Sequence, residues 1–423
     1  MSITTLLSTL ALLGTPLFIL FGAITLYLNH QEGINISAIM IEFYRMASMP
    51  TLSAIPLFTF AGTLLAESKA PKRLVDVAQS LVGFLPGGLP IVTIVVCAFF
   101  TAFTGASGVT IIALGGLLYP ALVKEKYNER FSIGLVTSCG SIGLLLAPSL
   151  PLILYGLIGQ VSVDKLFAAG LLPSVLLVSV LAIYSTFVGV RGKVDRIPFR
   201  WKNIVKSIAI AKWELPLPFI VVGGIYGGII TASEAAAITA LYVFIVEVFI
   251  QKDLTLKTDV PRVIVESMTM VGSILVILGV AMGLTNYLID VDIPTRIFEW
   301  VKPLITSQAM FLLLLNIFLL IVGCLMDIFS AIIVVVPIIT PIALKYGVDP
   351  VHLGIIFLTN LEVGYLHPPL GLNLFIASFR FKRSLYELYW ATLPFLILVV
   401  LCLLIITYVP GLSLWLVELL KIK

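Results

Sequence analysis

The sequence predicts an all-α polytopic membrane protein built as an inverted repeat. Each half is expected to hold one re-entrant helical hairpin and one broken helix. Three observations lead to this fold class: an extremely apolar composition, two apolar runs too long for a single membrane span, and glycine and proline spacings that recur later in the chain.

The composition places most of the chain in a lipid bilayer. Of the 423 residues, 60% are hydrophobic and only 11% are charged, and the mean hydropathy is +1.14. A soluble domain of this length could not bury so much apolar surface. The apolar runs are continuous, whereas a membrane β-barrel needs alternation. The net charge of +4 is modest and lies on loops, so no nucleic-acid partner is expected.

The chain divides into apolar runs and shorter amphipathic stretches. A spanning helix needs about 20 apolar residues. The apolar runs fall at 3–29, 50–67, 89–122, 130–160, 166–190, 214–231, 232–251, 262–288, 308–344, 350–379 and 385–409. The amphipathic stretches, expected to lie along the membrane surface, are 33–48, 71–84, 200–212, 293–304 and 411–421. The first run lacks a basic start and a small-residue cleavage site, so it is expected to be a retained helix.

Two of the apolar runs predict helical hairpins. Residues 89–122 and 308–344 are too long for one span, and each has glycines or a charge near its middle, at 104–108 and 323–327. Bent backbone at mid-membrane depth is tolerated only where it is buried in protein or lines a cavity. Each run is therefore expected to enter the membrane, turn, and leave on the same side.

The distribution of basic residues supports both hairpins together. With a cytoplasmic N-terminus and two re-entrant hairpins, 19 of the 26 Lys and Arg residues lie on the cytoplasmic side, as the positive-inside rule requires. If one hairpin spanned instead, every loop between them would change sides and the bias would collapse. The topology also predicts a periplasmic C-terminus.

Helix-breaking residues recur with one offset. Gly134 and Pro148 are 14 residues apart, Gly354 and Pro368 are also 14 apart, and the second pair follows the first by 220 residues. Because the halves enter from opposite sides, this predicts an inverted repeat, the architecture of secondary transporters. A duplicated scaffold without a transport role is the alternative.

Four pieces of irregular backbone should converge: the two hairpin tips and the proline breaks at 146–151 and 364–371. Unwound carbonyls can hold Na⁺, and half-helix N-termini attract anions. The candidate Na⁺ ligands, partly through backbone carbonyls, are Gly105, Ser107, Gly143, Pro148, Gly323, Met326, Asp327, Gly364 and His367. The candidate substrate contacts are Thr104, Ser149, Asn360, His367 and Asn373. For any single hydroxyl, including that of Thr359, a packing role or a bond to its own helix is the alternative.

Three titratable residues are candidates with two interpretations each. Asp327 could favour a cation at the second tip, or it could cap the returning helix. Glu362 could face a buried cavity or act as a proton-linked group. His367 could donate to an anion or carry a proton, or it could pack with only its carbonyl in use.

The sequence lacks the motifs of several classes of enzyme. There is no Walker A pattern, nucleophile elbow or H-E-x-x-H motif in the sequence. The remaining classes are an ion-coupled transporter and a membrane-embedded enzyme or channel. A channel would not need two hairpins each paired with a broken helix, and no convergent catalytic set is found. We therefore expect a transporter and not an enzyme.

Five stretches in order carry a family resemblance from about residue 10 to residue 410. They are Ile55-Pro56-Leu57-Phe58 with Ala61-Gly62, Leu85-Pro86-Gly87-Gly88-Leu89, Leu166-Phe167-Ala168-Ala169-Gly170, Gly347-Val348-Asp349-Pro350-Val351-His352-Leu353-Gly354, and the stretch 364–374 around the double proline. On these residues the chain resembles the large membrane subunit (M subunit, DctM-like) of a tripartite ATP-independent periplasmic (TRAP) transporter.

The resemblance implies an elevator-type mechanism coupled to a Na⁺ gradient in the bacterial inner membrane. It implies two protein partners, a small four-helix membrane subunit and a periplasmic substrate-binding protein, besides membrane lipid. The implied substrates are C4-dicarboxylates, sialic acids or related carboxylates. The expected division is scaffold at 1–88, transport-domain half 1 at 89–165, scaffold at 166–304, transport-domain half 2 at 308–384, and a C-terminal scaffold helix at 385–423. A proton-coupled organic-anion transporter is the alternative.

The sequence departs from the family pattern at three points. The first tip has Ser107 as its main hydroxyl where the family tends to show more serines. His367 stands where a threonine is usual, and Ala147-Pro148 replaces a double proline. If that threonine hydroxyl normally binds Na⁺, a carbonyl or water must replace it in this chain, because imidazole is a poor ligand for a hard cation.

Overall fold

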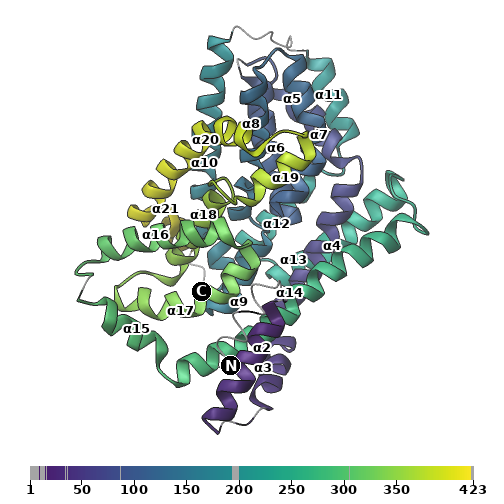
Figure 1. The fold of residues 1–423 in the computed structure, drawn as a ribbon. Coiled ribbons are helices and arrows are strands. Elements are labelled where there is room, and N and C mark those ends of the chain that lie inside the picture. Colours follow the sequence, from purple (N-terminus) through teal and green to yellow (C-terminus); the bar gives the residue numbers. More distant parts are fainter. Residues whose placement is uncertain are drawn as a thin grey trace.

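The computed structural model describes residues 9, 15, 17–33, 35, 37–85, 87–192, 200–303 and 305–420. The regular structure in these ranges is entirely helical, as predicted (Figure 1). The first apolar run, 3–29, is described mainly from α2 (Leu17–Gln31) onward, and most of the expected helix before it lies outside the described residues.

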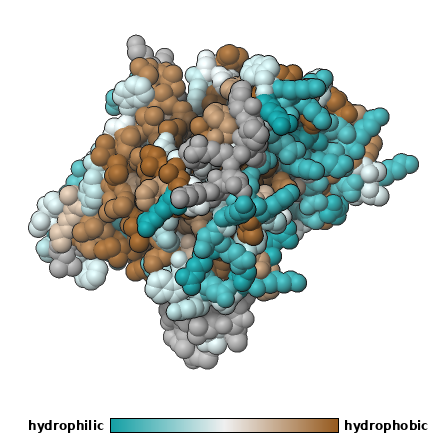
Figure 2. Space-filling model, turned by 90° about the horizontal axis from the view of Figure 1, so that it is seen from above, coloured by the Kyte–Doolittle hydropathy of each residue, from teal (hydrophilic) through white to brown (hydrophobic). Residues whose placement is uncertain are grey.

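The helices are long and apolar enough for a multi-pass membrane protein. In the described ranges seven helices could cross a membrane by length and composition, or up to nine if each of two bent helix pairs is one span. Apolar side chains cover much of one side of the molecule seen from above, and hydrophilic side chains cover much of the other (Figure 2). These apolar helices agree with the prediction that most of the chain lies in a lipid bilayer.

One group of helices packs together at the lower right of Figure 1. In this group α4 (Ala54–Glu67) packs against α13 (Ala232–Phe244) and α14 (Asp259–Asp290), and α14 also packs against α2 and α3 (Ser37–Ala47). The short η1 (Pro50–Ser53) precedes α4, and a π-helical turn, η3 (Ile245–Ile250), continues α13.

The first predicted hairpin consists of two helices, and the break between them lies at the predicted tip, 104–108. The run 89–122 forms α6 (Gly88–Thr104) and α7 (Ser107–Lys124), which pack against each other. Gly105 ends α6 with a φ of +65°, a left-handed conformation that favours glycine. A broken helix follows as α8 (Glu129–Cys139), η2 (Ile142–Leu145) and α9 (Leu150–Gly159), with a 44° bend.

The second half repeats this order with a different packing. The run 308–344 forms α16 (Gln308–Leu325) and α17 (Ile328–Lys345). The second broken helix is α18 (Pro350–Gly364) and α19 (Leu372–Phe381). Whereas α6 and α7 pack on each other, α16 packs mainly on α18, and α17 packs mainly on α9.

The two halves exchange contacts reciprocally. The returning arm α7 of the first hairpin packs on α19 of the second half, and the returning arm α17 packs on α9 of the first. This exchange is consistent with the predicted repeat. The orientation of the halves across the membrane stays a prediction.

The remaining helices connect or flank these groups. The five amphipathic stretches form helices as expected, and their place at the membrane surface stays a prediction. Besides α3 they are α5 (Ala70–Val82), α11 (Trp201–Ile210), α15 (Ile293–Val301) and α21 (Gly411–Leu419). The other connecting helices are α10 (Val163–Arg191), α12 (Pro216–Tyr226) and α20 (Leu385–Tyr408). Although the expected division puts α10 and α20 in the scaffold, α10 packs on α6 and α18, and α20 packs on α8 and α18.

Candidate functional site

The tip of the first hairpin lies against the first break. A methyl group on Gly105 would come within 2.6 Å of the Leu150 side chain, the first residue of α9. The Thr101 hydroxyl donates to the Gly140 carbonyl at 2.9 Å and lies 2.7 Å from the Thr110 hydroxyl. Both arms of the hairpin are thus tied to the end of α8, where the broken helix leaves its regular path.

The first break holds buried hydroxyl groups that lack a partner. Pro148 follows Ala147 through a cis peptide bond in the extended stretch between η2 and α9. Ser149 precedes α9, but its side chain makes no cap hydrogen bond. The hydroxyls of Ser138, Ser141 and Ser149 are all buried with no partner among the described residues. Buried polar groups are costly without a hydrogen bond or ligand, so these oxygens are available to a bound ion, substrate or water.

The tip of the second hairpin lies against the second break. A methyl group on Gly364 would come within 2.6 Å of the Gly323 carbonyl carbon. The Tyr365 hydroxyl accepts a hydrogen bond of 2.6 Å from the Ile328 N–H, and the Cys324 thiol donates to the His367 carbonyl at 3.4 Å. In each half the tip therefore lies against its own break, and the convergence of all four pieces at one site stays a prediction.

Asp327 occupies the N-cap of α17. One of its oxygens accepts from the Phe329 and Ser330 N–H groups, both at 3.0 Å, and the other accepts from the Ser330 hydroxyl. Its side chain is exposed at the tip, next to the half-buried Met326. The capping interpretation is thus realised, and an additional action on a cation stays a prediction.

His367 is exposed at the edge of an apolar cavity. The cavity has a volume of about 300 Å³ and is lined by α16 residues together with His367, Pro368 and Pro369. The His367 carbonyl already accepts from Cys324, as one of the two interpretations requires. Its imidazole stands at a cavity wall that is otherwise almost wholly apolar, so it could meet a polar group that enters there.

Two buried amides carry free acceptor oxygens. Asn360 donates to the Asn316 side-chain oxygen and to the Ile356 carbonyl, both at 2.8 Å. Asn373, next to the start of α19, donates to the Thr137 carbonyl of α8 at 3.4 Å. Both side chains are fully buried, and the amide oxygen of each has no partner among the described residues. The Asn373 contact also joins the second break to the first half.

Glu362 is the buried carboxyl group of this region. It is 1% exposed, and neither of its oxygens has a hydrogen-bond partner in the described part of the chain. An unpaired carboxylate at this depth is expensive, so a proton or a cation is expected to neutralise it.

Three other candidates have their polar atoms engaged locally. The Gly143 carbonyl accepts from the Leu146 N–H at 3.1 Å. The Thr359 hydroxyl bonds back to Ile355 of its own helix at 2.7 Å, the alternative foreseen for it. The Thr104 hydroxyl donates to the Ala106 carbonyl at 3.5 Å.

Sequence reasoning missed several polar residues of this region. Tyr365 was part of the predicted break but received no role. Ser138 and Ser141 flank Cys139, and their signal was two hydroxyls in an apolar segment just before a predicted break. Asn316 sits alone in an apolar helix, a pattern that indicates a buried partner. Among the described residues no group of three or more His, Cys, Asp or Glu side chains could hold a metal ion; the oxygen donors near the breaks are hydroxyls, amides and carbonyls.

Comparison with known proteins gives matches over nearly the whole chain. Residues 4–412 match the family model of the tripartite ATP-independent periplasmic transporter, DctM component. The chain is 35% identical over 434 residues to the C4-dicarboxylate TRAP transporter large permease protein DctM of Rhodobacter capsulatus, with 98% of each chain covered. It is 38% identical over 380 residues to the isethionate TRAP transporter permease protein DctMQ of Oleidesulfovibrio alaskensis, covering 89% of this chain and 59% of that longer protein.

Two more distant matches extend the comparison. The ectoine/5-hydroxyectoine TRAP transporter large permease protein UehC of Ruegeria pomeroyi is 28% identical, with 97% of this chain and 96% of that protein covered. The crystal structure of the Alcanivorax borkumensis YdaH transporter matches with a TM-score of 0.55 at 13% identity, over 90% of this chain and 89% of that one. At that identity the likeness concerns the fold alone. These four proteins are all named as transporters.

Proposed function

The chain belongs to the DctM component family of the tripartite ATP-independent periplasmic transporters, and on this premise we propose that it is the substrate-translocating subunit of a Na⁺-coupled importer of a small organic anion. It is a multi-pass membrane protein of a transport family and not an enzyme. The proposal places it in a bacterial inner membrane with a cytoplasmic N-terminus and a periplasmic C-terminus.

The observation that carries the proposal is a set of buried oxygens at or near the breaks that have no hydrogen-bond partner among the described residues. Ser149, Asn360 and Asn373 each hold such an oxygen, and they belong to both halves of the chain. Neutral hydroxyl, amide and carbonyl oxygens near helix breaks are the ligands by which secondary transporters hold Na⁺. The residues therefore fit a Na⁺ ion, which would give these oxygens a partner and hold each tip against its break.

Movement of one helix group against the other would carry the substrate across the membrane. We place α4, α13 and α14 in the static group, and the two hairpins with both broken helices in the moving group. Gly62 of α4 supports a close contact between the groups, because a methyl group there would lie 2.7 Å from the Thr104 Cα at the first hairpin tip. In this proposal α10 and α20 move with the hairpins, since they pack on α6, α8 and α18.

The substrate is proposed to be a C4-dicarboxylate, a sialic acid or a related organic acid. Relatives are named for C4-dicarboxylate, isethionate and ectoine, so family membership alone does not choose among them. The N-terminal ends of α9 and α19 both begin at a break, where helix dipoles attract anions. The proposed partners are a small four-helix membrane subunit and a periplasmic binding protein that delivers the substrate.

Proton coupling is the second candidate function. The specific observation in its favour is Glu362, a buried carboxyl group that has no hydrogen-bond partner among the described residues. A Glu362→Gln variant separates the two candidates. Na⁺ coupling predicts uptake that still follows the Na⁺ gradient, whereas proton coupling predicts loss of response to an imposed pH gradient.

Substrate uptake into proteoliposomes tests the proposed function. The chain is reconstituted with its small membrane partner and supplied with its binding protein, and labelled C4-dicarboxylate, isethionate and sialic acid are compared. The expected result is concentrative uptake of one acid that requires the binding protein. Absence of uptake for every organic acid, in vesicles where all subunits are folded, would contradict the proposal.

A further inference from the structure

A polar cavity lies between α5 and α11, and no residue of either hairpin or either break lines it. Its volume is about 350 Å³, within the range of small-molecule sites. The charged residues of its lining are Arg73 and Asp76 from α5, and Arg200 and Lys206 at α11, so three cations face one anion. A hydrogen bond of 2.7 Å between the Ser80 and Ser207 hydroxyls holds the two helices together beside it.

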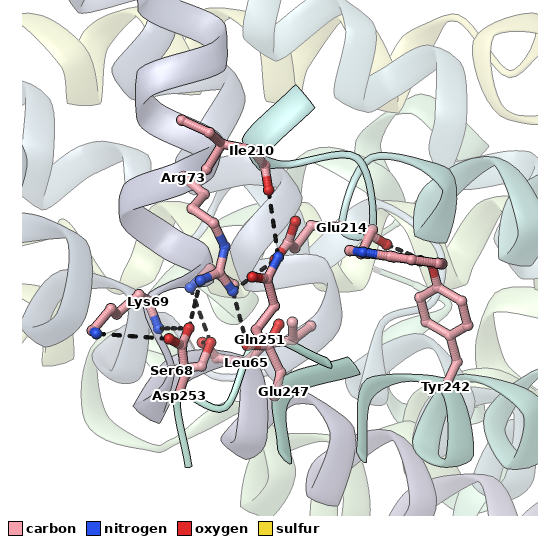
Figure 3. A network of polar contacts seen from close by, with 12 residues as sticks. Leu65, Ser68, Lys69, Arg73, Ile210, Glu214, Tyr242, Glu247, Gln251 and Asp253 are labelled. Carbon is pink, nitrogen blue, oxygen red and sulfur yellow. Dashed lines mark hydrogen bonds and ion pairs between the residues drawn. The ribbon is translucent and has the colours of Figure 1, made fainter. Parts of the chain in front are cut away.

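Arg73 is a fixed wall of this cavity. Its guanidinium pairs with Glu214 at 2.6 Å, with Glu247 at 2.9 Å and with Asp253, and Figure 3 shows these acids around it. The side chain is buried, and its Nε has no partner in the described part of the chain. Three carboxylates more than neutralise Arg73, so the attraction for an anion comes from Arg200 and Lys206.

The opposite face of α11 is apolar and exposed. Trp201, Val205 and Ile208 are 68%, 52% and 39% exposed, and their spacing puts them on one side of the helix. An exposed tryptophan beside apolar residues is typical of a helix at the membrane interface. The stretch 191–212 carries seven Lys or Arg residues and a single acid, which is typical of segments that bind anionic lipid.

We propose that the cavity between α5 and α11 binds the phosphate group of an anionic phospholipid. Arg200 and Lys206 pair with the phosphate, because cationic side chains make charge-assisted hydrogen bonds to its oxygens. Asn203, which also lines the cavity, offers a neutral donor. A soluble phosphate would present the same chemistry, but the apolar face of α11 places the cavity beside a membrane and favours a lipid as the source.

Native mass spectrometry of the purified full-length chain with added phosphatidylglycerol tests this site. The double variant Arg200→Gln, Lys206→Gln removes both cationic partners proposed for the phosphate. It should therefore bind phosphatidylglycerol at least about tenfold more weakly than the unaltered chain. Lys206→Gln and Lys202→Gln are compared as a matched pair, since each removes one lysine charge from α11 and only Lys206 lines the cavity. Lys206→Gln should weaken binding, whereas binding by Lys202→Gln should stay within about twofold.

Two further measurements test the role of Asp76 and the source of the phosphate group. Asp76→Asn removes the one acid of the lining and should tighten phosphatidylglycerol binding by a few fold. Glycerol phosphate added at millimolar concentration should displace little lipid. Equal weakening by Lys202→Gln and by Lys206→Gln would overturn the site in favour of a diffuse basic surface. Soluble glycerol phosphate that binds as tightly as the lipid would overturn the lipid as its source.

Discussion

The Tyr365 hydroxyl accepts a hydrogen bond of 2.6 Å from the backbone N–H of Ile328. Tyr365 is the first residue after α18 at the second break, and Ile328 is the first residue of α17 at the second hairpin tip. Both residues are buried. A single side chain therefore links the two pieces of irregular backbone in this half, and satisfies one of the N–H groups that begin α17.

Tyr365→Phe should loosen the second hairpin tip. The substitution keeps the ring but leaves the buried Ile328 N–H without a partner, at a cost of about 1–3 kcal/mol. We expect faster hydrogen exchange over residues 326–332 and slower uptake at unchanged expression. Tyr408→Phe is the control, because it removes an exposed 3.2 Å bond to the Ala309 carbonyl. Identical exchange in the two variants would show that the Tyr365 bond does not hold the tip.

Gly364→Ala should disrupt the packing of the second hairpin on α18. The added methyl would lie 2.6 Å and 2.7 Å from backbone atoms of Gly323, which can yield only by moving one helix. We expect a lower melting temperature in detergent and loss of uptake. Gly272→Ala in α14 makes the same change where no atom lies within 4 Å, so it should be neutral or slightly stabilising. Equal melting temperatures for the two variants would contradict the close approach.

Two substitutions at Asp327 separate its two interpretations. Asparagine is a good N-cap, so Asp327→Asn retains the cap while removing the charge, whereas Asp327→Ala removes both and should cost about 0.5–2 kcal/mol. If the carboxylate acts on Na⁺, Asp327→Asn raises the Na⁺ concentration needed for half-maximal uptake at an unchanged melting temperature. An unaltered Na⁺ dependence in Asp327→Asn would limit the residue to capping.

Arg73→Met should destabilise the chain strongly. Arg73 is the common partner of Glu214, Glu247 and Asp253 (Figure 3), and its loss leaves buried carboxylates without a counter-charge, at a cost of roughly 3–5 kcal/mol. Thermal unfolding in detergent measures the effect. Arg262→Gln breaks an exposed pair with Glu67 and should change the melting temperature little. Similar shifts for both variants would argue against a buried cluster.

Glu125 gives a pH-dependent prediction. Burial raises the pKa of this carboxyl above its ordinary value of 4.5, although a hydrogen bond from Gln79 acts to lower it. The folded chain thus holds the proton more tightly than the unfolded chain, and the contribution to stability is lost as the pH rises from 4.5 through the raised pKa. Glu125→Gln should raise the melting temperature at pH 7 and flatten its pH dependence in that window. A steeper pH dependence of the melting temperature in the variant would contradict a raised pKa of Glu125 in the folded chain.

The helical elements were predictable because the bilayer imposes strict rules on composition. Continuous apolar runs predicted the helices, and Gly105 and Asp327 marked the hairpin breaks that the structure shows within one or two residues. The breaks at Pro148 and Pro368 followed from the missing proline N–H. Local chemistry decides these features, so one sequence suffices to find them.

Contacts between distant segments could not be predicted in the same way. Nothing in the sequence indicates that Tyr365 reaches Ile328, or that Asn373 reaches Thr137, because these pairs depend on how helices pack. The Arg73 cluster was likewise hidden, since its three acids lie more than 140 positions away along the chain. The same holds for the candidate ion ligands. The spacing of glycines and prolines predicts where they lie along the chain, but helix packing determines which of their oxygens remain without a partner.

Uptake driven by an imposed Na⁺ gradient tests the central claim most directly. Proteoliposomes contain this chain, its small membrane partner and the binding protein loaded with the organic acid, and the inward Na⁺ gradient is varied at constant pH and membrane potential. Na⁺ coupling predicts accumulation that rises with the gradient and vanishes when K⁺ replaces Na⁺. Accumulation that is indifferent to the Na⁺ gradient would contradict it.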